Sequence, residues 1–72
     1  MEVWQTEILN YMEVNNLSQK QMAKKINENG GDIKSSGFSH WMKTPPRSIP
    51  SKVNIMALEK ILDGKIRFIS NA

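Results

Sequence analysis

The 72-residue sequence contains no cysteine and only one histidine, His40. The lack of cysteine excludes disulfides, iron–sulfur clusters and catalytic thiols, and a single histidine leaves no histidine pair of the kind that many zinc sites use. No apolar run approaches the roughly 18 residues of a membrane-spanning helix, and the N-terminus lacks the basic start and apolar core of a signal peptide. We therefore expect an intracellular, cytoplasmic protein that is not inserted in a membrane and uses no metal or other cofactor.

Basic residues are missing from the first 17 positions, which hold three glutamates as their only charged residues. Residues 18–52 carry seven basic and two acidic residues, a balance of +5, whereas the whole chain has a net charge of +3. A basic centre beside an acidic end favours binding to a polyanion, although solvated surface lysines would give the same pattern.

A chain of this length, 39% hydrophobic and 24% charged, predicts one small globular domain. Apolar residues recur at helical spacing in four segments, at residues 3–14, 19 to about 29, 34–43 and 53–62. Each segment is followed by residues that end helices: Asn15-Asn16, Asn29-Gly30-Gly31, Thr44-Pro45-Pro46 and Asp63-Gly64. The prediction is an all-α domain over residues 1–64, with a C-terminal tail over 65–72.

Two of these helices have candidate starts. Ser18 and Gln21 fit a capping box, and Leu17 with Met22 fits the hydrophobic staple that accompanies it. For the third helix, either of the two serines at 35 and 36 could cap the start.

The helical spacing also predicts which side chains are buried. Phe38 and Trp41 are expected in the core, and Met42 could lie either in the core or at the surface. The other expected core positions are Trp4, Ile8, Leu9, Tyr11, Met12, Met22, Ala23, Ile26, Val53, Ile55, Met56, Leu58, Ile61 and Leu62.

The tail alternates basic and apolar residues from Lys65 to Ile69, which predicts a short strand or extended arm, with a last helical turn as the alternative. Such an arm could pair with a second chain in a homodimer, or fold back over Trp4 and Ile8.

The order of residues from the second helix onward resembles the helix-turn-helix of the Cro and phage-repressor family, and the resemblance covers about residues 3–63. It implies a lambda-repressor-like domain of four to five short helices, in which a small residue at Ala23 lets the second helix cross closely over the third at Phe38. The step between these two residues is fifteen, about five more than is usual in the family, so the turn between the helices is enlarged. The matching residues are Leu17-Ser18-Gln19, Met22-Ala23, Ile26, Ile33, Phe38 and Trp41.

In such a domain the outward side chains of the third helix and the start of the second face DNA. The third helix offers lysine, serine and histidine but no arginine, asparagine or glutamine for bidentate base contacts, so we expect contact with DNA to be more electrostatic than specific. The candidate nucleic-acid contacts are Gln19, Lys20, Lys34, Ser35, Ser36, Ser39, His40, Lys43 and Arg47.

Apolar residues at and after the end of the third helix could form a patch beside these basic residues, suited to a protein partner. The candidate partner contacts are Ser39, His40, Met42, Lys43, Pro45, Pro46 and Ile49. The chain as a whole is similar to the modulator-of-repression proteins of temperate phages. That similarity implies an antirepressor in a bacterial host, which binds the N-terminal DNA-binding domain of the phage repressor.

Two other functions stay open. One is a Cro-like homodimer that binds double-stranded operator DNA directly, and the other is a protein-interaction domain without a nucleic-acid role. Enzymatic activity is not expected, because Ser39 and His40 are helical neighbours whose side chains diverge. The glycine pair at 30 and 31 lacks the lysine and hydroxyl residue of a phosphate-binding loop and is interpreted as a turn.

Overall fold

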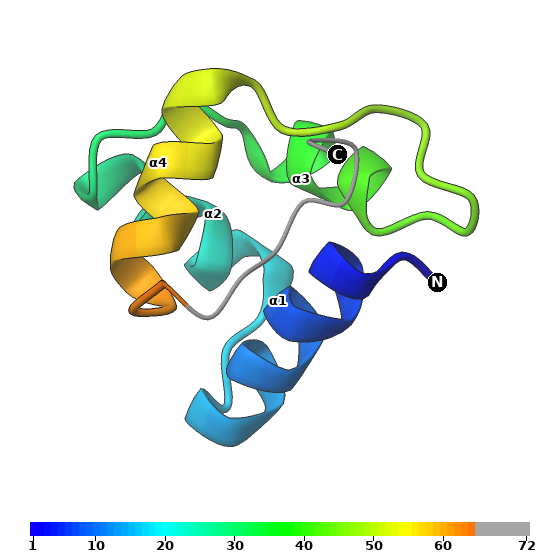
Figure 1. The fold of residues 1–72 in the computed structure, drawn as a ribbon, viewed down its shortest axis with the longest axis horizontal. Coiled ribbons are helices and arrows are strands. Elements are labelled where there is room, and N and C mark those ends of the chain that lie inside the picture. Colours follow the sequence, from blue (N-terminus) through cyan, green and yellow to red (C-terminus); the bar gives the residue numbers. More distant parts are fainter. Residues whose placement is uncertain (65–72) are drawn as a thin grey trace.

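The computed structural model describes residues 1–64, which form four helices and no strand (Figure 1). The helices are α1 (Val3–Asn15), α2 (Gln19–Glu28), α3 (Ser35–Trp41) and α4 (Lys52–Ile61). This confirms the predicted all-α fold and the enlarged turn between α2 and α3. The arm predicted at residues 65–69 lies outside the described residues. None of the described helices is both long enough and apolar enough to cross a membrane.

Three of the four helices end in the same way, with a residue in the left-handed conformation that turns the chain. These residues are Asn16 (φ 54°), Gly30 (φ 97°) and Asp63 (φ 54°). In each case the next amide donates to a carbonyl five residues earlier, which is the closing bond of a Schellman motif. The bonds run from Leu17 to Met12, from Gly31 to Ile26 and from Gly64 to Glu59, each 2.9 Å. The predicted helix ends at these three places are therefore confirmed.

The predicted capping box of α2 is also present. The amide of Gln21 donates to the Ser18 hydroxyl over 3.1 Å, and the amide of Ser18 donates to the Gln21 side-chain oxygen over 2.8 Å. A second box that the sequence analysis missed starts α1, where the side chains and amides of Glu2 and Gln5 bond each other reciprocally.

The predicted serine cap of α3 is wrong. Lys34 occupies the N-cap position, because its carbonyl accepts the first helical hydrogen bond, from the Phe38 amide over 2.9 Å. No side chain caps the helix. Ser35 is therefore the first helical residue. The helix also ends at Trp41, two residues earlier than predicted.

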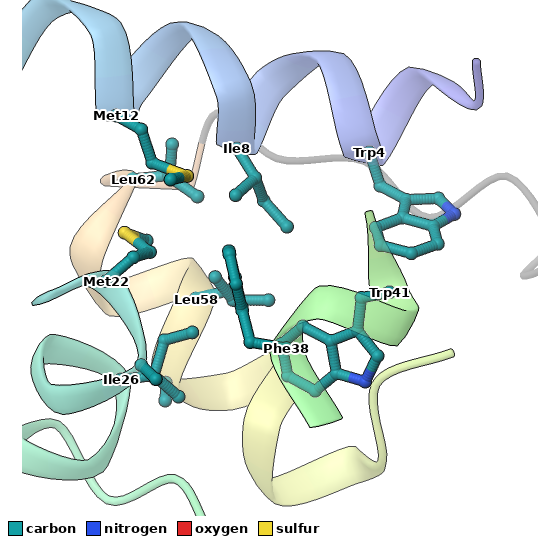
Figure 2. Close-up of a cluster of buried hydrophobic side chains, with 11 residues drawn as sticks. Trp4, Ile8, Met12, Met22, Ile26, Phe38, Trp41, Leu58 and Leu62 are labelled. Atoms are coloured by element: carbon teal, nitrogen blue, oxygen red, sulfur yellow. The ribbon is translucent and has the colours of Figure 1, made fainter. Parts of the chain in front are cut away.

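One cluster of side chains from all four helices forms the core (Figure 2). Phe38 is fully buried and its ring lies 5.6 Å from that of Trp41, measured between centroids. Ala23 and Phe38 both belong to this cluster, and α2 contacts α3, as the predicted crossing requires. Burial of each large apolar side chain contributes about 1.5–3 kcal/mol. The buried members are Trp4, Ile8, Met12, Met22, Ala23, Ile26, Phe38, Trp41, Ala57, Leu58 and Leu62.

The predicted inner face of α4 is partly wrong. Val53 and Met56 are each 50% exposed, whereas Asn54 and Ala57 are buried in their place. Successive helical positions point about 100° apart, so only one arc of α4 can face the core. Two hydrogen bonds between the Asn54 side chain and the backbone of Asp32 hold that asparagine on the inward arc.

Candidate functional site: the surface around α3

Two asparagines hold the enlarged turn, residues 29–34, which leads into α3. The Asn27 side chain accepts a hydrogen bond from the Ile33 amide and donates one to the Ile33 carbonyl, both 2.8 Å. Asn54 bonds Asp32 in the same way. Its side-chain oxygen accepts from the Asp32 amide over 2.8 Å, and its side-chain nitrogen donates to the Asp32 carbonyl over 3.2 Å. Asp32 is thus bound by a side chain of α4, and the next residue, Ile33, by a side chain of α2. These bonds fix the point where α3 begins.

The same turn packs tightly against its neighbours at Gly31. A Cβ added there would lie 2.7 Å from the Asn54 side-chain oxygen and 2.9 Å from the Ile26 carbonyl oxygen, and it would also overlap the Ile26 side chain. No residue larger than glycine fits without movement. Asn54 itself is only 4% exposed and also donates to the Ser51 hydroxyl over 3.1 Å.

The other end of α3 is bound by Gln5 of α1. Its side chain is 0% exposed, and its amide nitrogen donates to the carbonyls of Trp41 and Lys43, both over 2.7 Å. The loop that follows, residues 42–51, is closed against the helix by a bond of 3.0 Å from the Arg47 amide to the His40 carbonyl. Neither Gln5 nor Asn54 was predicted as a structural anchor.

Three lysines gather around a shallow hollow between α2 and the start of α3, which we call the lysine hollow. Lys20 and Lys24 contribute from α2 and Lys34 from the end of the turn, and Glu28 is the one acidic residue in the lining. The hollow has a volume of about 560 Å³. Lys24 was not predicted, although its position four residues after Lys20 places it on the same helical face.

The structure divides the predicted nucleic-acid contacts into two groups. Lys20, Lys34 and Ser35 line the lysine hollow, with Gln19 and Ser36 exposed on the same two helices. The remaining four are not part of its lining and lie on the second half of α3 or in the loop: Ser39, His40, Lys43 and Arg47.

The predicted partner contacts also differ in exposure. Ile49 is 67% exposed and Pro45 is exposed, as are the polar contacts His40 and Lys43. Met42 is half-buried and packs against the core. Ser39 and Pro46 are half-buried as well. The exposed apolar part of this surface is therefore in the loop rather than on α3.

A second hollow, of about 320 Å³, lies between the C-terminal halves of α1 and α4 and is lined by Tyr11, Val14 and Leu62 among others. Glu7 and Asp63 make its rim acidic, unlike the lysine hollow. Within residues 1–64, no three histidine or acidic side chains come close enough together to hold a metal ion.

No protein-family model, curated protein or solved structure matches this chain. The similarity to phage regulators therefore stays a prediction based on the residues that carry it. The surface around α3 has three lysines beside the start of the helix and an exposed isoleucine in the loop after its end.

Proposed function

We propose that this protein regulates transcription by binding the N-terminal DNA-binding domain of a phage repressor, so that the repressor no longer occupies its operator. The supporting observation is the loop after α3, where Ile49 is 67% exposed on the same loop as Lys43 and Arg47. An exposed aliphatic side chain on a loop that also carries cations fits a protein interface, in which the apolar group is buried and the cations bond carboxylates or carbonyls at the rim.

The outward side of α3 supports a protein partner over a specific DNA site. Its exposed residues are Ser35, Ser36 and His40, and none of them is an arginine, asparagine or glutamine. Those three residue types make the bidentate contacts that distinguish guanine or adenine in the major groove. A regulator with this helix would gain its specificity from the repressor domain that it binds.

The test compares two aspartate substitutions of exposed aliphatic residues, Ile49→Asp in the loop and Val53→Asp on α4. We expect Ile49→Asp to weaken binding to the purified repressor domain by about 30-fold, as for an interface anchor, and to leave the repressor on its operator in a gel shift. Val53→Asp should bind within about twofold of wild type. Met42 is less suitable for this test, since its packing against the core would mix folding with binding.

The proposal would be wrong if wild-type protein did not bind the repressor domain in calorimetry. It would also fail if both aspartate variants bound equally well, because the loop would then not be part of the interface.

The lysine hollow favours a second candidate function, which is direct binding of double-stranded operator DNA by a homodimer. Lys20, Lys24 and Lys34 would neutralise phosphates, and each phosphate contact contributes about −0.9 to the slope of log K against log salt concentration. The double variant Lys20→Ala/Lys24→Ala should therefore lower the magnitude of the slope by about 1.8 per protomer, in fluorescence anisotropy with a palindromic duplex.

A charge-matched control removes Lys52 and Lys60 of α4, which do not line the hollow. Equal slopes for the two double variants would show that the hollow has no special part in DNA binding. If the wild-type protein bound DNA only in the presence of repressor, the result would favour the antirepressor over a homodimer that binds operator DNA directly.

A further inference from the structure

We propose that Gln5 is a positioning residue for the partner surface: its side-chain amide holds the beginning of the loop after α3 in the orientation that the repressor domain binds. This inference rests on the proposed antirepressor function. Gln5 itself is fully buried and would not touch the partner.

Every hydrogen-bonding group of the Gln5 side chain is used. The amide nitrogen has two N–H donors, and these bond the carbonyls of Trp41 and Lys43, 36 and 38 residues further along the chain. The side-chain oxygen accepts a bond of 2.7 Å from the Glu2 amide within the capping box of α1. The capping box fixes the position of the side-chain oxygen of Gln5. The amide nitrogen is therefore held in place beside the end of α3.

The helix that Gln5 binds needs such support. α3 has seven residues and begins with Ser35, Ser36 and Gly37, all weaker helix formers than alanine. A helix this short is marginal in isolation, and its last carbonyls have no partner within the helix. Gln5 bonds the Trp41 carbonyl, and so supplies a partner where the helix cannot.

Exposed residues of the loop follow this anchor directly, from Lys43 to Pro45. Between Lys43, bound by Gln5, and Arg47, whose amide bonds the His40 carbonyl, the chain is held at both ends. Ile49 follows two residues later. A surface already fixed in the free protein avoids the entropic cost of ordering it on binding, which raises affinity.

The experiment uses Gln5→Met, which keeps the length of the side chain and removes both donors together with the oxygen that accepts from the Glu2 amide. Its control is Leu62→Ala, a core substitution at the opposite end of the cluster from Trp4 and Trp41 (Figure 2). Both variants are titrated with the purified repressor N-terminal domain at a temperature where circular dichroism shows them folded. We expect binding about tenfold weaker for Gln5→Met, because the loop is no longer held in its binding orientation, and no more than about twofold weaker for Leu62→Ala.

Native-state hydrogen exchange gives a readout that needs no partner. The Arg47 amide should exchange about tenfold faster in Gln5→Met than in Leu62→Ala, because opening of the loop breaks its bond to His40. If Gln5→Met does not fold, Gln5→Asn takes its place, since its amide is one methylene too short to reach both carbonyls.

The possible outcomes separate the two proposals. If wild-type protein does not bind the repressor domain, the proposed function fails and the role of Gln5 in it fails too. If wild type binds but the Gln5 variant binds as well as Leu62→Ala, or if Arg47 exchange is the same in both, only the positioning role of Gln5 is overturned.

Discussion

The two connections on either side of α3 are built differently. The turn at residues 29–34 is bound by four side-chain hydrogen bonds from Asn27 and Asn54 and has no room for a side chain at Gly31. The loop at residues 42–51 is bound near its start by Gln5 and further on exposes Ile49. The turn therefore belongs to the structural framework, whereas residues 47–49 of the loop are exposed and available for contact with a partner.

The difference has an energetic reason. Lengthening a connection costs little in loop-closure entropy, but fixing each residue of it costs roughly 1–2 kcal/mol. In the turn, the paired hydrogen bonds of the Asn27 and Asn54 side chains and the close packing at Gly31 offset that cost. Substitutions in the turn should therefore reduce stability, while substitutions in the exposed part of the loop should not.

The largest expected effect comes from Gly31→Ala. The added methyl group would overlap the buried Ile26 side chain and lie 2.9 Å from the Ile26 carbonyl oxygen, neither of which can move freely. We expect the free energy of unfolding to fall by about 3 kcal/mol. For a domain of this size, whose core contributes roughly 3–5 kcal/mol, only about 0–2 kcal/mol of stability would remain, and up to about half of the protein would be unfolded. Thermal unfolding followed by circular dichroism measures the change.

The matched control is Gly37→Ala in α3. There the added methyl group meets only the end of the half-buried Ile33 side chain, and alanine favours a helix by about 1 kcal/mol over glycine. Its stability should stay within about 1 kcal/mol of wild type. Equal losses for the two variants would show that the turn is not tighter than α3.

The next largest effect is expected for Asn54→Ala. Removal of this buried amide leaves the Asp32 amide and carbonyl without their protein partner, so stability should fall by about 2 kcal/mol in urea unfolding. Asn27→Ala removes a similar pair of bonds at an exposed position, where water can replace them, and should cost about 1 kcal/mol. A greater loss for Asn27→Ala would contradict the assignment of Asn54 as the main anchor.

Local sequence signals account for most of the fold. Ser18 with Gln21 predicted the start of α2, and the left-handed residues Asn16 and Gly30 lie at predicted helix ends, because caps act within a few residues of each other. The burial of Phe38 and Trp41 followed from their spacing.

Long-range polar contacts were not predictable in this way. Gln5 bonds carbonyls 36 and 38 residues away, and Asn54 bonds a residue 22 positions earlier. Nothing in a helical pattern indicates which backbone groups a polar side chain will meet after folding. The helical spacing also predicted wrongly that Val53 and Met56 are buried. Hydrophobicity alone does not show that Asn54, which lies between them in the sequence, faces the core instead. At the site the omission was of another kind, because the spacing of four residues between Lys20 and Lys24 indicates that both lie on one face of α2.

The smallest effect is expected for Ile49→Ser, and it tests the loop directly. Ile49 is 67% exposed, so its replacement by serine should change the free energy of unfolding by less than about 0.5 kcal/mol. The same substitution in the turn, Ile33→Ser, removes a half-buried side chain that packs against the core and should cost about 1–2 kcal/mol. Urea unfolding of both variants compares the two connections with identical chemistry. A loss above about 1 kcal/mol for Ile49→Ser would mean that the isoleucine stabilises the fold, and the loop would then be a second structural connection instead of a surface free to bind a partner.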